Sequence, residues 1–484
     1  MTGARFRRVA AILALVTVVL LPIGWWGYDR AFGRDIPTYL TDEEEFKYGS
    51  IGNDGAEGVP YAIWLVLPEV FPEYLPGPGG YSSLGFVWEK GRGPTEPPIG
   101  FSRARVGVER MAINCAICHV VSARLDEASE PRFYLAGAAN TVDIQGYQRF
   151  LSRSARDPRF NPDVLLPAMG SRLELSWLDR LIYRLAIIPI TRSRLLEQGE
   201  AFAWTASRPA WGPGRIDPFN PVKFNMLGLP EDSTIGNSDM QAIWNLNARE
   251  AIRQRAPLHW DGLNTSIREV VISSALGDGA VAEEWDWERI FRVERYLRTL
   301  PPPPSPHRPD PAALSRGKVL FDQDCASCHA HGGVRTLTLI PAEEIGTDPH
   351  RLAMWTDEAR DAYLNYRRGY DWNFRSFQNV EGYVAEPLWG LWLNGPYLHN
   401  GSIPTLADLL KPPKDRPKAF VRGTDLLDPV HGGFAAPVCD PQMPERGRFC
   451  YDTTLPGNGN GGHLYGTDLS GDEKADLLAY LLTL

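Results

Sequence analysis

Two Cys-x-x-Cys-His pentads, at residues 115–119 and 325–329, are the segments of this chain best suited to carry chemistry. The pentad is the attachment signature of a c-type haem: both cysteines form thioethers with the macrocycle, and the adjacent histidine becomes the proximal iron ligand. Two pentads predict two covalently bound haem c groups and therefore redox chemistry. The expected attachment residues are Cys115, Cys118, Cys325 and Cys328, and the expected proximal ligands are His119 and His329.

Two other interpretations of the Cys-x-x-Cys spacing stay open from the pentads alone. A zinc site needs two further ligands beside each pair, and no second cysteine or histidine pair follows at zinc-finger spacing. A thioredoxin-like dithiol needs a βαβ pattern and does not require the histidine that follows each pair. Four of the six cysteines lie in the pentads, each pair with its histidine, and this favours haem c.

The N-terminus predicts a membrane anchor. Arg5, Arg7 and Arg8 precede an apolar run at residues 9–27, which as a helix would be roughly 28 Å long and nearly span the bilayer hydrocarbon. No clear Ala-x-Ala cleavage site follows, so a single-pass anchor at 1–30 is favoured over a cleaved signal peptide. The basic flank stays in the cytoplasm. The main body is therefore expected in the periplasm, on the inner membrane, outside which bacteria attach haem c.

The exported part of the chain has a globular composition. The formal net charge of −9 argues against a nucleic-acid partner and is compatible with a small redox protein as electron donor or acceptor. The two remaining cysteines, Cys439 and Cys450, are expected to form a local disulfide in an oxidising compartment, the alternative being two buried thiols.

A proline run at residues 301–304 is the clearest domain boundary, because polyproline conformation is incompatible with a helix interior or a central strand. It predicts an N-terminal haem c domain at 35–300 and a C-terminal cytochrome c-like haem domain at 308–484. The expected fold is mainly α with many loops. A transmembrane helix would precede two cytochrome c-like haem domains, the first of them enlarged by insertions.

Strand patterning is weak in the first domain, and helical patterning is clearer. Helices are expected within 174–188, 236–254 and 281–300. The first of them should stop or kink before Pro189, which lacks the backbone N–H of a helix interior.

The second domain begins and ends like a small cytochrome c. Apolar residues at helical spacing within 311–325 lead directly into the second pentad. At the other end, Ser470 and Glu473 are spaced as a capping box, after which leucines recur on one face up to Leu481. In a cytochrome c fold the first and last helices cross, and both ends of this domain fit that plan.

The run LNGPYLHNGSIPTL at residues 393–406 resembles the signature of the bacterial di-haem cytochrome c peroxidase superfamily. Segments 80–88, 258–262 and 461–467 are most similar to the rubber oxygenase-like branch of that superfamily. The resemblance covers most of the exported chain. The first run is specific for the superfamily, and the three shorter segments point to the branch.

The resemblance implies that the two haems have different roles. The reactive centre for peroxide or dioxygen would be the haem held by His119, and the haem held by His329 would transfer electrons to it. Trp260 is by the same resemblance the candidate for an electron relay between them, the alternative being an ordinary core tryptophan. A calcium ion occurs between the domains in relatives, and backbone carbonyls near Asn394 and Pro396 are where one would be expected.

The sixth ligand of the C-terminal haem should come from the same domain. His463 is the expected ligand, because it lies in a Gly-rich loop just before the last helix, a kind of segment that can fold over a haem. The alternative is a surface-loop histidine. His399 is the second candidate, His331 is too close to the pentad to reach the opposite face, and Met443 is the ligand that the peroxidase resemblance would favour.

Together these patterns predict a membrane-anchored di-haem c-type cytochrome, a redox enzyme of the cytochrome c peroxidase type. Two rival functions are an oxygenase that cleaves an apolar substrate and a pure electron carrier with both irons six-coordinate. A peroxidase needs an acid–base group on the distal side of its reactive haem. The sequence identifies no such residue; His259 is either a pocket base or a packed histidine.

Overall fold

The computed structural model describes residues 24, 25, 27–29, 33–282, 286–370, 372–443 and 445–484. Residues 1–23, which form most of the predicted anchor at 1–30, lie outside the described residues. Within the part of the chain that is described, no helix has both the length and the apolar character needed to cross a membrane. The anchor therefore stays a prediction.

The N-terminal half is built around an antiparallel four-stranded sheet with the strand order β1-β3-β4-β2. The prediction of a mainly α fold with many loops is therefore confirmed only in part: helices and long loops prevail, but the fold is mixed helix and sheet. The sequence does not predict these strands because arginines interrupt the alternation of apolar and polar residues. In the fold, the guanidinium of Arg103 stacks 3.8 Å from the ring centre of Tyr61 and forms an ion pair with Glu109 on the next strand. The strands are β1 (Arg34–Asp35), β2 (Val59–Pro60), β3 (Phe101–Val106) and β4 (Val108–Ile113).

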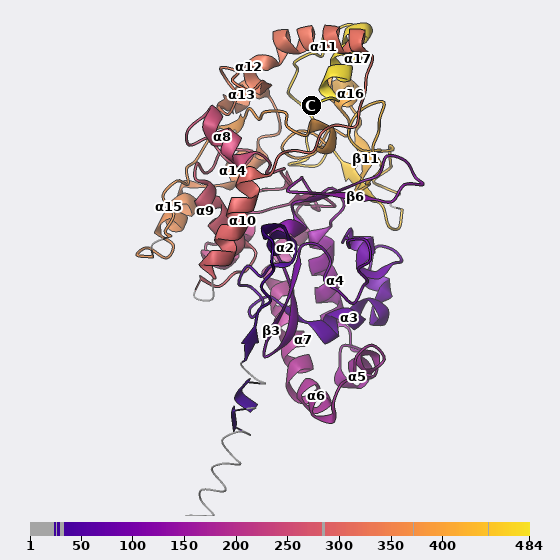
Figure 1. Cartoon of the computed structure of the whole chain (residues 1–484), viewed down its shortest axis with the longest axis vertical. Coiled ribbons are helices and arrows are strands. Elements are labelled where there is room, and N and C mark those ends of the chain that lie inside the picture. Colours follow the sequence, from indigo (N-terminus) through magenta and orange to yellow (C-terminus); the bar gives the residue numbers. More distant parts are fainter. Residues whose placement is uncertain (1–23, 26, 30–32, 283–285, 371, 444) are drawn as a thin grey trace, which may run out of the picture.

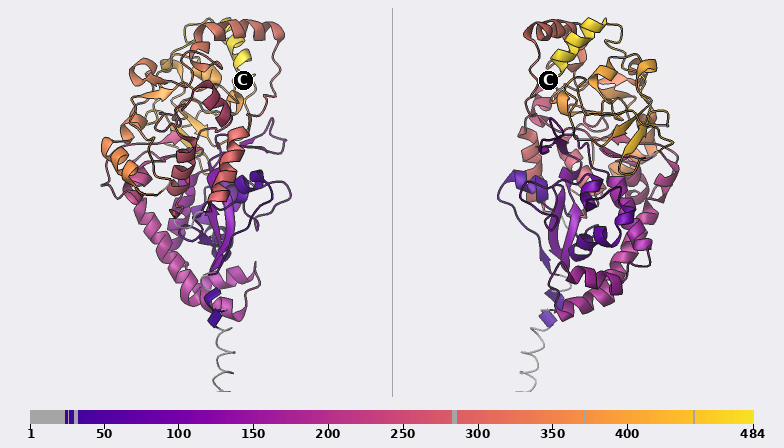
Figure 2. Two further views of the ribbon diagram at one scale, coloured as in Figure 1. Left: turned by 60° about the vertical axis from the view of Figure 1, so that its left-hand side comes forward. Right: turned by 90° about the vertical axis from the view of Figure 1, so that its right-hand side faces the viewer.

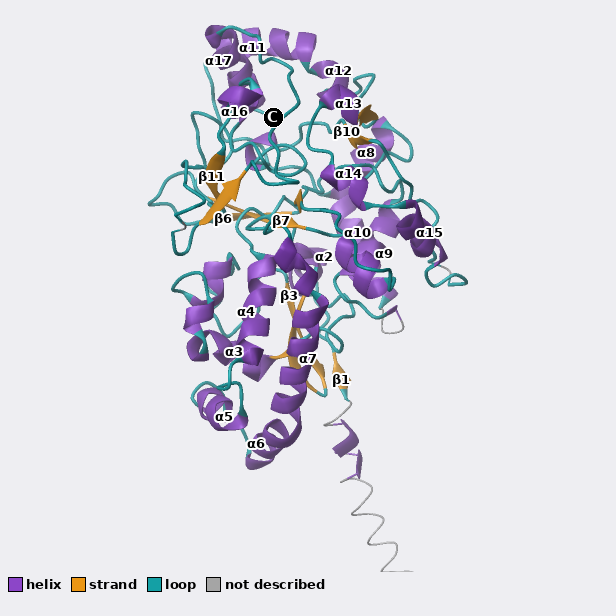
Figure 3. Cartoon of the chain, turned by 180° about the vertical axis from the view of Figure 1, so that it is seen from behind, coloured by secondary structure: helices purple, strands orange, loops and turns teal. Residues whose placement is uncertain are grey.

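Helices cover this sheet and enclose an aromatic core. Trp64 stacks on Tyr81 with ring centres 4.2 Å apart, and Phe101 from β3 and Tyr147 pack against the same pair. Figure 3 shows two of the long helices, α4 and α7, side by side next to β3. The helices are α2 (Asp42–Tyr48), α3 (Tyr61–Val70), α4 (Ile144–Arg156), α5 (Pro162–Gly170), α6 (Trp177–Ile182) and α7 (Ile188–Ala201).

The helix predicted within 174–188 does not stop before Pro189. It begins as α6 and continues through a π-helical turn at Tyr183–Ile187 into α7, where Pro189 occupies the first turn. A π-helical turn changes the hydrogen-bond register by one residue, and this local change accommodates a residue without a backbone N–H.

The other two predicted helices have different outcomes. The prediction for 281–300 agrees with α10 (Trp287–Thr299), whereas most of 236–254 is not helical. Only α8 (Leu246–Ile252) forms there, because Asn245 adopts a left-handed φ of 53° and interrupts any helix that reaches it from the N-terminal side.

The first and last helices of the second domain cross as predicted. These are α11 (Pro311–Asp324) and α17 (Gly471–Leu481), the latter with the predicted capping box between Ser470 and Glu473. A Cβ atom at Gly317 would lie 1.9 Å from the carbonyl oxygen of Asp476, so only glycine permits this close crossing. The predicted disulfide between Cys439 and Cys450 is also present, with an S–S distance of 1.99 Å.

The two predicted domains share a hydrophobic core. Trp392 packs edge-on against Tyr134 with ring centres 5.5 Å apart, and its indole N–H donates to Pro303 O within the proline run. Figure 1 accordingly shows a continuous molecule with α11 and α17 at the upper end and α6 at the lower end. The boundary at the proline run stays a prediction.

The remaining helices and strands are β5 (Val120–Ala123), β6 (Arg132–Leu135), β7 (Arg215–Ile216), β8 (Ser238–Asp239), α9 (Ile267–Gly277), α12 (Ala326–His329), β9 (Leu339–Pro341), α13 (Ala342–Ile345), α14 (His350–Met354), α15 (Asp357–Asn365), β10 (Gly382–Val384), α16 (Leu406–Leu409), β11 (Ala419–Arg422) and β12 (Phe449–Asp452).

Candidate haem sites

The first pentad lies in a tight turn between β4 and β5. The side chain of Asn114 accepts a hydrogen bond from the backbone N–H of Ala116 at 3.0 Å and donates to Gly49 O at 2.9 Å. This one residue caps the turn that carries Cys115 and fixes the turn to the end of α2. The pentad is thereby held from both sides before any cofactor is attached.

The ring of His119 is oriented by a backbone carbonyl. Its Nδ1 lies 2.9 Å from Gln241 O, and because a carbonyl oxygen only accepts, Nδ1 carries the hydrogen. Nε2 is then left with its lone pair, as a metal ligand requires. Burial lowers the pKa of His119 to about 4, so the imidazole is neutral at physiological pH.

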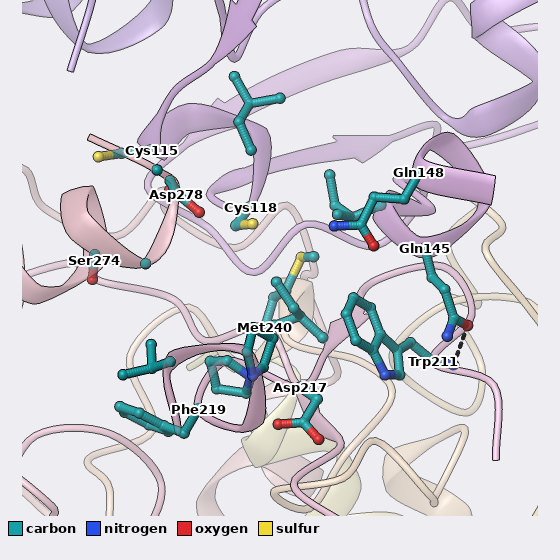
Figure 4. Close-up of a pocket in the computed structure, with 18 of the residues that line it drawn as sticks. Cys115, Cys118, Gln145, Gln148, Trp211, Asp217, Phe219, Met240, Ser274 and Asp278 are labelled. Atoms are coloured by element: carbon teal, nitrogen blue, oxygen red, sulfur yellow. Dashed lines mark hydrogen bonds between the residues drawn. The ribbon is translucent and has the colours of Figure 1, made fainter. Parts of the chain in front are cut away.

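A cavity of about 870 Å³ opens beside this pentad, in the size range of cofactor and ligand sites. Cys115, Cys118 and His119 line it, and Figure 4 shows both sulfur atoms at its wall. The rest of the wall is largely apolar. A cavity of this size, with two thiols and an oriented imidazole on its wall, fits a covalently attached haem. The apolar side chains on the wall include Phe219, Val222, Met240, Leu258, Ile267, Val270 and Leu276.

The zinc and dithiol interpretations find no support around the first pentad. Burial raises the pKa of Cys115 to about 12 and that of Cys118 well above its usual value, which disfavours a reactive dithiol. In the described part of the chain, no group of three or more His, Cys, Asp or Glu side chains is placed to hold a metal ion. The turn also joins β4 to β5, which belong to two separate antiparallel sheets, and not the strands of a βαβ unit.

The second pentad continues directly from α11 into α12. His329 again donates from Nδ1 to a backbone carbonyl, Glu386 O, at 2.7 Å. Burial lowers the pKa of His329. Both proximal histidines are therefore held in the same tautomer by the same kind of acceptor.

His463 faces His329 across a space that fits a haem iron. Their ring centres are 6.1 Å apart and the ring planes differ by 43°. Two imidazoles on opposite sides of one metal, each with a bond of about 2 Å to it, have ring centres roughly 6 Å apart. Burial, followed by the proximity of His329, lowers the pKa of His463 to about 3, and its Nδ1 is buried with no hydrogen-bond partner among the described residues. The geometry therefore supports His463 as the sixth ligand.

Arg416, which sequence reasoning missed, holds the loop that carries His463. It is 3% exposed, and its guanidinium donates to Asn460 O at 2.6 Å, Gly462 O at 2.9 Å and His463 O at 3.2 Å. These bonds stabilise the left-handed φ of 47° at His463. No local sequence signal connects residue 416 with this loop.

The other candidate ligands of the second site are engaged elsewhere or exposed. The ring of His399 stacks on Tyr383 with centres 4.1 Å apart, and its Nε2 lies 3.1 Å from the tyrosine hydroxyl. Met443 is 71% exposed beside the disulfide. Neither position favours a role as iron ligand.

Trp260 lies between the two sites. Its indole N–H donates to Asp239 O at 2.8 Å, two residues before Gln241, and the ring is on the wall of the cavity. Its carbonyl accepts from Val384 N at 2.9 Å, two residues before Glu386. Trp260 therefore joins the two segments that orient the proximal histidines, a position consistent with the predicted relay.

Two ionisable side chains on the cavity wall are candidates for the distal group. His259 packs edge-on against Phe219 with ring centres 5.4 Å apart, and burial lowers its pKa to about 4. Asp278, which sequence reasoning missed, follows the last residue of α9 and lies near Cys115 and Cys118 (Figure 4). Burial raises the pKa of Asp278 to about 7, close to the value that suits a general acid or base at neutral pH.

The expected calcium site stays a prediction. Asn394 donates from Nδ2 to Trp389 O at 3.3 Å, and its Oδ1 is buried with no hydrogen-bond partner among the described residues. An amide oxygen is a ligand that calcium accepts. Nothing else in the described residues bears on this expectation.

Comparison with known proteins bears on the second domain. Residues 382–421 match the family model described as "RoxA-like, cytochrome c-like". The matched segment of this chain is thus similar to a RoxA-like cytochrome c-like domain. The match includes residues 393–406, on which the resemblance was based, as well as Glu386 and Arg416. It supports a RoxA-like di-haem cytochrome c family at a coarse level and implies haem c binding with a redox role; membership of the peroxidase superfamily stays a prediction.

Two curated relatives also match this chain, and both come from Sinorhizobium fredii (strain NBRC 101917 / NGR234). The uncharacterized protein y4iM is 31% identical over 295 residues, which cover 52% of this chain and 65% of that protein. The uncharacterized protein y4iJ is 42% identical over 111 residues, which cover 21% of this chain and 18% of that protein. The chain thus spans less than two thirds of the length of either relative, and neither name states an activity.

Proposed function

We propose that the protein is a membrane-anchored, periplasmic di-haem c cytochrome that acts as a peroxidase. Electrons from a small redox protein would enter at the C-terminal haem and pass to the N-terminal haem, where peroxide is reduced. When bound, haem c supplies one-electron redox chemistry and, at an open coordination position, a site for peroxide or dioxygen. The protein's side chains determine which of the two haems has such a position.

The difference between the distal sides of the two sites carries this proposal. His329 is faced by His463 at a ring-centre distance of 6.1 Å, which suits a six-coordinate electron-transfer centre. His119 is instead accompanied by a cavity of about 870 Å³. The haem itself would fill much of that cavity, so the proposal rests on the fact that no histidine ring among the described residues is paired with His119 as His463 is paired with His329.

The residues around the cavity have separable tasks. Cys115 and Cys118 tether the cofactor, and His119, held by Gln241 O, presents Nε2 to it. The apolar part of the wall would strengthen electrostatic interactions near it by lowering the local dielectric constant. Asp278, near Cys115 and Cys118, holds a proton at its carboxyl oxygen up to about pH 7, and we assign to it the exchange of a proton with a bound peroxide.

The apolar wall favours a second candidate function, an oxygenase that cleaves an apolar substrate. Phe219, Leu258, Val270 and Leu276 line the same cavity, and apolar substrates bind by burying apolar surface of this kind. The two functions differ in co-substrate, since the peroxidase consumes peroxide and the oxygenase consumes dioxygen.

Spectroscopy and turnover distinguish the three functions. The peroxidase should show one low-spin and one CO-binding haem, and after reductive activation it should turn over hydrogen peroxide with a reduced cytochrome as donor. Absence of that turnover refutes the peroxidase, and dioxygen uptake with an apolar polyene would then support the oxygenase. Two low-spin haems inert to CO would leave only the electron carrier.

Exposed apolar side chains support the proposed membrane location. Trp177, Leu181 and Leu185, on α6 and the π-helical turn, are 76%, 43% and 70% exposed. Trp25 and Tyr28, at the end of the predicted anchor, are 72% and 60% exposed. Figures 1 and 2 show both groups at the same end of the molecule. Tryptophan and tyrosine are the side chains enriched at membrane interfaces.

Hydrogen exchange of the full chain in nanodiscs tests this orientation. We expect α6 and α7 to exchange more slowly in lipid than in detergent, and a Trp177→Ser, Leu185→Ser double variant to lose that difference. Leu40→Ser is the matched control, because Leu40 is 96% exposed and lies just before α2. Equal exchange in lipid and detergent for the unmodified protein would contradict the proposal.

A further inference from the structure

A chain of three hydrogen bonds joins the two proximal histidines. His119 donates from Nδ1 to Gln241 O at 2.9 Å, and His329 donates from Nδ1 to Glu386 O at 2.7 Å. The side chains of the two acceptor residues then meet: Gln241 Nε2 donates to Glu386 Oε1 at 2.9 Å. The bridge formed by Gln241 and Glu386 thus runs from one imidazole to the other through hydrogen bonds and covalent bonds alone.

An ion pair fixes the bridge in place. Arg249, from α8, donates from Nη1 to Glu386 Oε2 and from Nη2 to Glu386 Oε1 at 3.2 Å, and Nη2 also donates to Pro257 O at 2.6 Å. Arg249 is 6% exposed, and the side chain of Glu386 is 19% exposed. Removing two charges from water is costly, so a buried pair of this kind is weak evidence for stability and more often serves to fix a geometry.

We propose that the Gln241–Glu386 bridge is a positioning element that couples the two haem sites. This inference rests on the proposed function, because it requires a haem at each pentad. The strength of the hydrogen bond from Nδ1 changes the basicity of the ligating imidazole and so the reduction potential of its iron. No bond is made or broken in the bridge and no proton leaves its donor. A single electron leaves one iron and arrives at the other.

The bridge uses the side chains of Gln241 and Glu386, whereas the histidines bond to their backbone carbonyls, so the two kinds of contact can be altered separately. Both histidines bond to backbone carbonyls, so replacing the side chain of Gln241 cuts the bridge and leaves the partner of His119 in place. Gln241→Leu removes the hydrogen bond to Glu386 with little change in size. Glu386→Gln retains an oxygen acceptor for Gln241 and removes the charge that faces Arg249. Gln442→Leu is the matched control, since Gln442 is exposed between Cys439 and Cys450 and lies outside both the cavity and the bridge.

Three properties are measured for each variant: the haem content by mass, the spin state of each haem by EPR, and both reduction potentials. The rate of electron exchange between the haems is then measured after CO photolysis of the half-reduced protein. For Gln241→Leu we expect unchanged spin states, slower exchange, and a change of about tenfold in the equilibrium constant for electron sharing, equivalent to about 59 mV. Gln442→Leu should match the unmodified protein. Glu386→Gln should fall between the two.

The outcomes separate this inference from the proposed function. Fewer than two haems per chain would overturn both. Two haems with unaltered potentials and exchange rate in Gln241→Leu would overturn the bridge and leave the peroxidase proposal standing. If Gln241→Leu does not fold, Gln241→Met, which also removes the hydrogen bond to Glu386, decides instead, and potentials and an exchange rate equal to those of the unmodified protein refute the coupling.

Discussion

Replacing Asp278 by asparagine tests whether the cavity of the first site holds a proton at neutral pH. Asp278 follows α9, and burial raises its pKa from 3.8 to about 7. The negative end of the helix dipole acts in the same direction. The neighbouring groups do not oppose this rise: Cys115 and Cys118 become neutral thioethers, and Glu57, which packs against Gly279, is an acid whose own pKa is raised by burial.

The expected effect on stability follows from this shift. Between about pH 4 and pH 7, the folded protein retains a proton on Asp278 that the unfolded chain has released, so the free energy of unfolding falls as pH rises. A rise of about 3 pKa units, at roughly 1.36 kcal/mol each, corresponds to about 4 kcal/mol. This contribution is fully present below about pH 4 and is lost above about pH 7. An asparagine side chain cannot titrate, so the variant lacks this slope.

Guanidinium unfolding of the unmodified protein and of Asp278→Asn, followed by Soret absorbance between pH 4 and pH 8, measures this difference. The free energy of unfolding of the unmodified protein, relative to the variant, should fall by about 4 kcal/mol across the range. Asp415→Asn is the control, because Asp415 is exposed and its removal should leave the pH dependence unaltered. A difference between Asp278→Asn and the unmodified protein that does not vary with pH would refute the assignment of a protonated carboxyl to this cavity.

Three further changes test the second domain. His463→Ala should convert one low-spin EPR signal to high spin, because it removes the ring 6.1 Å from that of His329; an unaltered spectrum would contradict sixth-ligand status. Arg416→Gln should release the loop and give a mixture of the same two spin states, and a purely low-spin sample would show that the loop holds without Arg416. Gly317→Ala should lower the free energy of unfolding by about 3 kcal/mol or more in denaturant titrations, since its Cβ would lie 1.9 Å from Asp476 O. An equal stability would mean that α11 and α17 can move apart freely.

The features predictable from the sequence are those whose signals are local. The capping box at Ser470 and Glu473, the helical period of 311–325 and the eleven-residue spacing of Cys439 and Cys450 each lie within a short segment. In a short segment, hydrogen bonds between neighbouring groups and the entropy of closing a short loop determine the local structure. The structure of such a segment can therefore be predicted from its residues alone.

The sheet and the residues that orient the histidines depend on long-range contacts. The strand β3 carries Arg105, whose partner Asp29 lies 76 residues away and is known only once the chain has folded. Residues 238–243 lack a helix despite a helical pattern, and this extended path is what brings Gln241 O to His119. A local preference is overridden here by a contact more than a hundred residues away, and no periodicity within the segment reports it.

The two haem sites differ on their distal sides much more than on their proximal sides. Nδ1 of His119 and Nδ1 of His329 both donate to backbone carbonyls, at 2.9 and 2.7 Å, so proximal hydrogen bonding alone gives the two irons similar ligands. Under the proposed function, a difference in reactivity between haems at these two sites would arise from His463 on one side and from the cavity on the other. A fold that needs two unequal haems can therefore use the same pentad twice and vary only what faces it.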